Sequence, residues 1–241
     1  GLAQGTGLSV VARAATTDQV EPWQRVLSQA GVLGTRVTVL PPAVALPPYL
    51  ASLTLTEASA LPADMASLWA TVHPYGGAVA VLSDDPTAGA KALRAMGLPG
   101  AVVTAGDRVV LVRRDGPLEG AAAWTHESAD AARTYFSRDR LVRTPLAVLW
   151  YGEGPGYGFF KIHDYGLGHK PVVANGRVVA LQQSTGTLFA YDAYTGRGFW
   201  QEKLVERGGG PAWVQDGSYE WRWTSTGGPT PRYACLGETV Y

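Results

Sequence analysis

The chain of 241 residues has one cysteine, no excess of charge of either sign and no long apolar run. Because Cys235 is alone, an internal disulfide and a cysteine-rich zinc site are excluded. Basic and acidic residues number 20 each, and this formal charge of zero argues against nucleic acid or an anionic membrane as the main partner. No apolar run approaches the roughly 20 residues that cross a bilayer, so no membrane span is expected.

What the chain does contain is typical of a globular protein with many turns. Hydrophobic residues make up 46% of the sequence, and 30 glycines and 16 prolines interrupt it. The sequence begins with a glycine and no signal peptide precedes it. We therefore expect a processed chain or a segment of a longer polypeptide.

Residues 1–114 alternate between strand-type and helix-type patterns. Strands are predicted at 8–12, 36–40, 49–56 and 78–82, helices at 18–30, 62–72 and 87–96, and a closing hairpin at 101–113. In the second helix, Pro62 fits the first position, and Met65, Leu68, Trp69 and Val72 form one apolar face. This order predicts an α/β fold with a mostly parallel, doubly wound (Rossmann-like) sheet that ends in an antiparallel edge.

After residue 116 the pattern changes to short strands without a convincing amphipathic helix. Asn175-Gly176 marks a hairpin over 172–181, and further strands are predicted at 187–192 and 198–205. Four strands in about 35 residues make an antiparallel unit of the size of a propeller blade. A second unit is expected to begin near Tyr233, with a turn at Gly237.

The sequence of the first of these units resembles a known repeat. Ala190, Asp192, Thr195, Gly196 and Trp200 follow the spacing Ala-x-Asp-x-x-Thr-Gly-x-x-x-Trp, which resembles a blade of pyrroloquinoline-quinone-type (quinoprotein) β-propellers. We expect the aspartate to accept hydrogen bonds from the backbone N–H groups of the turn, and the tryptophan to pack between neighbouring sheets. The repeat does not imply a bound quinone, because most propellers that carry it are understood to bind none.

Two further segments resemble partners of such a propeller. Residues 124–150 resemble the opening segment of propellers in large secreted proteins of planctomycete-like bacteria, where a degenerate methyltransferase-like domain precedes the propeller. Residues 8–113 resemble a class I S-adenosylmethionine methyltransferase from its second strand to its terminal hairpin, with His73-Pro74-Tyr75-Gly76-Gly77 at that fold's Arg-Pro-Gly-Gly turn. The resemblance implies a methyltransferase-like domain at 1–114, a linker and opening segment at 115–150, and one to two blades at 151–241.

The methyltransferase resemblance also implies a lost cofactor site. The first strand and its glycine-rich loop are missing, and Ala12-Arg13-Ala14-Ala15 offers no carboxylate for the ribose hydroxyls. We therefore expect no bound S-adenosylmethionine and no cofactor. The alternatives are a divalent metal or pyrroloquinoline quinone.

Candidate metal ligands lie in a glycine-rich stretch. His163, Asp164 and His169 place two imidazoles and a carboxylate within seven residues, a set that can bind a divalent metal. The alternative is a loop whose histidines cap turns or face solvent. Nothing in their spacing preorganises them as ligands.

Two other sites are candidates for binding. Glu57 ends a predicted strand, where open α/β sheets bind ligands, although a solvated glutamate is the alternative. Trp221 and Trp223 are two residues apart, so one face of a strand would carry both indoles, either for sugar rings or a partner surface or as a core between blades.

Together these features predict a non-catalytic binding or assembly module of a periplasmic or extracellular propeller protein. Its partners would be other protein chains or the missing parts of the parent protein. One alternative is a quinone-dependent oxidoreductase or a metal-dependent hydrolase. Another is a structural subunit that assembles through open blade edges.

Overall fold

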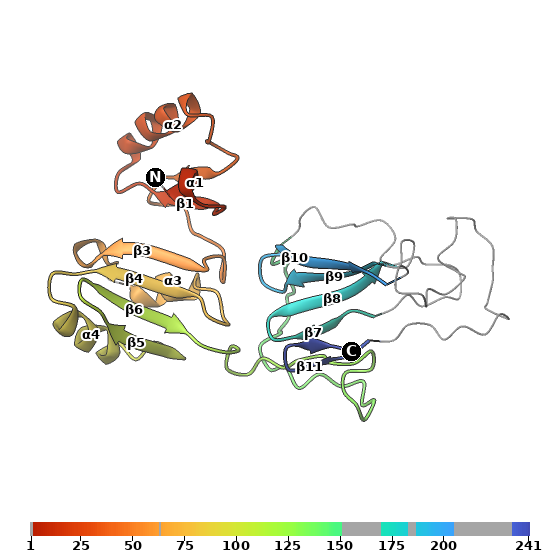
Figure 1. Cartoon of the computed structure of the whole chain (residues 1–241). Helices are drawn as coiled ribbons and strands as arrows, with labels where there is room; N and C mark the ends of the chain where they lie inside the picture. Colours follow the sequence, from red (N-terminus) through yellow and green to blue (C-terminus); the bar gives the residue numbers. More distant parts are fainter. Residues whose placement is uncertain (1, 63, 151–169, 183–186, 205–232) are drawn as a thin grey trace. The chain divides into compact units, whose positions relative to one another are not determined.

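The computed structural model describes residues 2–62, 64–150, 170–182, 187–204 and 233–241 (Figure 1). These residues form two compact units, Gly1–Leu46 and Pro47–Tyr241. The candidate metal ligands His163, Asp164 and His169, and the tryptophan pair Trp221 and Trp223, lie outside the described residues. Within the described ranges, no helix has the length and apolar character that a bilayer crossing requires.

The first unit is built on a pair of parallel strands. Its elements are α1 (Leu2–Gly5), β1 (Val10–Arg13), the 3-10 turn η1 (Thr17–Gln19), α2 (Val20–Gln29) and β2 (Val37–Leu40). β1 and β2 pair in parallel, as expected for a strand–helix–strand unit. Val37 and Val39 are buried, whereas Trp23 on α2 is 43% exposed.

The second unit opens with a mixed α/β segment, residues 47–116. Its elements are β3 (Leu53–Glu57), η2 (Ala58–Ala60), α3 (Met65–Ala70), β4 (Ala78–Leu82), α4 (Pro86–Ala95), β5 (Ala101–Ala105) and β6 (Val109–Arg114). The strand order is β3-β4-β6-β5 (Figure 1), and only β3 and β4 pair in parallel. The expected α/β class is therefore present. The described strands of residues 1–114 nevertheless form two sheets rather than one mostly parallel sheet.

The closing hairpin forms the antiparallel edge that the sequence predicts. β6, the second strand of the hairpin, pairs with β4, and this leaves β5 at the edge. This strand order has a physical reason. Val110 and Val112 of β6 are fully buried at the centre of the sheet, whereas Thr104 and Ala105 of β5 are exposed. The sheet thus places the more apolar strand of the hairpin in the middle.

The core of the α/β segment lies between the sheet and its helices. Met65, Trp69 and Val72 pack with a cluster of valines from β4 and β6, which confirms the apolar helix face predicted from the sequence. The helix begins later than the expected start at Pro62, because the Asp64 side chain accepts hydrogen bonds from the N–H groups of Ala66 and Ser67.

The described part of residues 117–241 contains two antiparallel sheets. The larger consists of β7 (Val172–Ala174), β8 (Arg177–Gln182), β9 (Thr187–Asp192) and β10 (Gly198–Lys203), in the order β10-β9-β8-β7 (Figure 1). The smaller pairs β11 (Cys235–Leu236) with β12 (Thr239–Val240). The four-stranded antiparallel unit read from the sequence is thus confirmed. The described residues show no closed ring of sheets.

The turn between β7 and β8 has the backbone that its sequence predicts. Asn175 has φ 48° and Gly176 has φ 70°. A two-residue hairpin of type I′ needs positive φ at both central positions, and asparagine and glycine are the residues that adopt it most readily.

Candidate functional site

A buried histidine–aspartate pair joins the α/β segment to the four-stranded sheet. His73 lies between α3 and β4, and Asp192 is the last residue of β9, 119 residues later. The Nε2 atom of His73 is 2.8 Å from Oδ2 and 3.0 Å from Oδ1 of Asp192. Both residues are buried. Removal of one partner from a buried pair of this kind strongly destabilises the folded protein.

The ring of His73 meets an acceptor at each nitrogen. Nε2 faces the carboxylate of Asp192, and Nδ1 is hydrogen-bonded to the backbone carbonyl of Pro74. Both ring nitrogens therefore have their hydrogen-bond partners within the fold. The pair therefore differs from a catalytic histidine–aspartate arrangement, in which Nε2 faces the nucleophile.

Asp192 also organises the turn that follows β9. Its Oδ1 accepts hydrogen bonds from the backbone N–H groups of Tyr194, at 2.8 Å, and Thr195, at 3.1 Å. This confirms the role predicted for the aspartate of the repeat. Burial by itself would raise the pKa of Asp192, but the hydrogen bonds from His73 and from the turn outweigh it, so the pKa lies below its ordinary value.

Aromatic rings surround the pair. The ring of Tyr194 packs edge-on against His73, with centroids 5.3 Å apart, and edge-on against Tyr49 at the same distance. Burial, together with the neighbouring hydroxyls of Tyr75 and Tyr49, raises the pKa of Tyr194 to about 12. The phenol therefore stays neutral at physiological pH and packs as an uncharged ring.

Two glycines let aromatic rings approach the turns of the sheet. A Cβ atom on Gly176 would lie 2.7 Å from the ring of Tyr75, and one on Gly196 would lie 2.2 Å from the ring of Trp150. Both glycines also have positive φ. The indole N–H of Trp150 donates to the carbonyl of Ala193 at 2.9 Å. Each of the two turns is thus covered by its own aromatic ring, and only a glycine leaves room for that ring.

A buried arginine secures the α/β side of this junction. Arg114 donates to the carbonyl of Val72 at 3.1 Å and to that of Trp69 at 2.9 Å, and its guanidinium lies over the indole of Trp69. These carbonyls lie at the end of α3, where a cation is favoured by the helix dipole. Burial lowers the pKa of Arg114 from its ordinary value. The arginine thus holds the end of α3 and the residues that connect it to His73.

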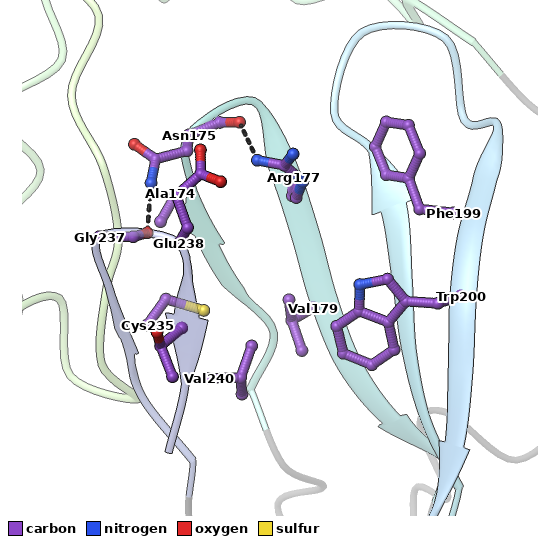
Figure 2. Close-up of a pocket in the computed structure, with 11 residues that line it drawn as sticks. Ala174, Asn175, Arg177, Val179, Phe199, Trp200, Cys235, Gly237, Glu238 and Val240 are labelled. Carbon is purple, nitrogen blue, oxygen red and sulfur yellow. Dashed lines mark hydrogen bonds between the residues drawn. The ribbon is translucent and has the colours of Figure 1, made fainter.

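A separate pocket of about 230 Å³ lies over one face of the four-stranded sheet (Figure 2). Figure 2 shows Cys235 and Val240 of the small sheet on one side and Trp200 on the other, with Val179 between them. The guanidinium of Arg177 lies at the rim, 5.5 Å from the ring of Phe199. Apolar side chains therefore form the floor of the pocket and charged groups its edge.

The thiol in this pocket is a structural group. Cys235 is 5% exposed and packs with Val172, Ala190 and their neighbours in the core of the sheet. Burial raises the pKa of the thiol, so it stays protonated near neutral pH and is a poor nucleophile.

Of the candidate site residues, only Glu57 lies in the described part of the chain. It is the last residue of β3 and its side chain is exposed. Among the described residues, no group of three or more histidine, cysteine or carboxylate side chains is arranged to hold a metal ion. The binding role of Glu57 and the metal site of His163, Asp164 and His169 remain predictions.

Sequence reasoning missed the pairing of His73 with Asp192. Each residue lay in a motif that the sequence does reveal, the His-Pro turn and the blade repeat. No local signal connects two positions so far apart in the chain.

Comparisons with known proteins identify no relative of this chain. No family model matches it, and neither a curated protein nor a solved structure is similar enough to count as a match.

Proposed function

We propose that this chain is a non-catalytic assembly module of an extracytoplasmic propeller protein, and that it binds further β-strands on an open sheet face. The single observation that supports this proposal is the packing of the small β11–β12 sheet on the four-stranded sheet. Cys235, with Tyr233 and Val240 beside it, covers the apolar face of β7, β8 and β9. Propellers are built from four-stranded sheets, the blades, that pack face to face with their neighbours.

The covered face continues into an uncovered part. Val172, Val179, Ala190 and Trp200 are successive cross-strand neighbours, so they form one row across all four strands. The first three are at most 2% exposed, whereas Trp200 is 40% exposed. A large aromatic side chain at the end of a buried row is a typical anchor for a partner. We infer that strands added beyond β12 cover Trp200 and fill the pocket in Figure 2.

The α/β segment supports the same function because its strand β3 lies at an open edge of the sheet. Among the described residues, β3 pairs only with β4, and its Leu53 and Leu55 are exposed. Edge strands of soluble proteins are usually blunted by charge, proline or a bulge. β3 carries one charged residue, Glu57, at its end and no proline. The extracytoplasmic location rests on the propeller resemblance alone.

Sedimentation velocity tests the assembly role. The isolated chain is expected to self-associate through the open face as its concentration rises, because association buries the exposed indole of Trp200. Trp200→Gln removes the anchor and should leave a monomer. Leu236→Gln is the matched control, because Leu236 is exposed on β11 outside the pocket lining. Association that is absent at all concentrations, or that Trp200→Gln leaves unchanged, contradicts the proposal.

Calorimetry tests the non-catalytic part. S-adenosylmethionine titrated into the chain should give no heat of binding, and purified protein should carry neither quinone absorbance nor stoichiometric metal. Micromolar binding of S-adenosylmethionine, or a bound quinone or metal, would favour an enzyme instead.

A further inference from the structure

Residues 133–149 form an exposed segment in which arginines alternate with large apolar side chains. Leu146, Val148 and Val142 are between 71% and 79% exposed, and Tyr135, Phe136, Leu141 and Leu149 are exposed as well. A single segment with so many exposed large apolar side chains is a candidate interaction site.

The charge of the segment is predominantly positive. Arg133, Arg138, Arg140 and Arg143 are all exposed, and none of them forms an ion pair within the described part of the chain. The only carboxylate of the segment, Asp139, accepts hydrogen bonds from backbone N–H groups, those of Ala122, Leu141 and Val142. The guanidinium groups are therefore available to an acidic partner.

The backbone of the last part of the segment is also available. Residues 143–149 belong to no helix or strand, and no hydrogen-bond partner for their backbone groups occurs among the described residues. Val148 and Leu149 line an apolar groove of about 320 Å³ with Pro47, Pro48 and Leu50. Apart from Pro145, which has no N–H group, these residues can thus form backbone hydrogen bonds with a partner that also buries the apolar side chains.

We propose that residues 133–149 bind an acidic β-strand of a partner protein, by backbone pairing along 143–149 and by ion pairs with the arginines. This inference rests on the proposed assembly function and names the chemistry of one partner. A bilayer would leave the open backbone groups of 143–149 without hydrogen bonds. A helix avoids this free-energy cost by bonding its own backbone groups, but an extended segment cannot. Nucleic acid would neutralise the arginines but leave the apolar side chains uncovered. An acidic strand satisfies the backbone, the charge and the apolar groove together.

The test uses a fluorescent eight-residue peptide of alternating glutamate and valine as the probe, and fluorescence anisotropy as the readout. The full chain should bind it, and added salt should weaken the binding because exposed charges are screened. Arg138→Glu/Arg140→Glu/Arg143→Glu should lower the affinity at least about tenfold. The matched control reverses three exposed basic residues elsewhere, Arg25, Lys91 and Arg108, and should bind like the original chain.

Leu146→Ser/Val148→Ser keeps every charge and should also weaken binding, by several-fold, because it removes apolar contacts. Circular dichroism verifies that each variant is folded. Absence of salt-sensitive binding, or equal binding by both charge-reversed variants, overturns the inference. Binding to vesicles of phosphatidylcholine with phosphatidylglycerol, or to oligothymidine, without binding to the peptide would also overturn it.

The Trp200→Gln variant separates this inference from the proposed function. It should lose self-association and still bind the peptide, because Trp200 lies outside the segment and its groove. Failure of peptide binding alone refutes the inference about 133–149 and leaves the open-face proposal standing.

Discussion

The His73–Asp192 pair allows a quantitative test, because both partners are buried and their distance is known. Between a protonated His73 ring and the Asp192 carboxylate, a distance of 2.8 Å and an effective dielectric constant of about 20 give a Coulomb attraction of about 6 kcal/mol. Removing two charged groups from water costs several kcal/mol, so only part of this attraction remains as net stability. Asp192 keeps two backbone donors when His73 is lost, which moderates the penalty.

We therefore expect His73→Ala to lower the free energy of unfolding by about 3 kcal/mol, since it leaves a buried carboxylate without its counter-charge. Asp192→Ala also removes the two hydrogen bonds of the turn and should cost about 4 kcal/mol. The double variant should cost about 2 kcal/mol less than the two single effects combined, because the second substitution no longer breaks the pair.

Cys235 provides the assay. It is the only cysteine of the chain and is buried in the same unit as the pair, so a pulse of thiol reagent at each urea concentration labels the unfolded fraction of that unit. Asp84→Asn is the control, because Asp84 is fully exposed and 3.8 Å from Arg108, and it should change stability by less than about 1 kcal/mol. Additivity of the His73 and Asp192 effects within about 0.5 kcal/mol would refute the coupling.

Three more predictions follow from the junction and the sheet core. Gly176→Ala and Gly196→Ala should each lower the free energy of unfolding in urea by about 2 kcal/mol or more, because the new methyl group meets an aromatic ring. Gly97→Ala should lower it by only about 1 kcal/mol, because Gly97 has a positive φ but open space around it. Equal effects at all three positions would contradict the close approach of the rings. The lowered pKa of Asp192 means that its contribution is complete above the ordinary carboxyl value of about 4 and is lost as the pH falls below it. Acid unfolding should therefore be less steep in Asp192→Asn, and identical acid profiles would contradict this. Cys235 should react slowly with iodoacetamide near neutral pH in the native protein and rapidly in urea, and fast native alkylation would contradict a buried thiol of raised pKa.

Features that depend on short stretches of sequence were predicted well. The Asn175-Gly176 turn needs positive φ at two adjacent residues, and the apolar side of α3 follows from its 3.6-residue period. The hydrogen bonds from the turn to Asp192 were likewise expected, because the aspartate and the turn are neighbours in the chain.

Features that depend on distant contacts were not predicted. Either strand of the β5–β6 hairpin could lie beside β4. Only the burial of Val110 and Val112 in the folded sheet decides that β6 does. For the same reason the junction was missed, since His73 acquires its partner only when β9 folds beside it.

Oxidative footprinting of two tryptophans tests the assembly claim most directly. Trp200 and Trp23 are similarly exposed, at 40% and 43%, but only Trp200 lies on the open sheet face. As the concentration of the chain rises, oxidation of Trp200 by hydroxyl radicals should fall while that of Trp23 stays constant. Equal oxidation of Trp200 in the dilute and the concentrated protein would contradict an assembly function of this face.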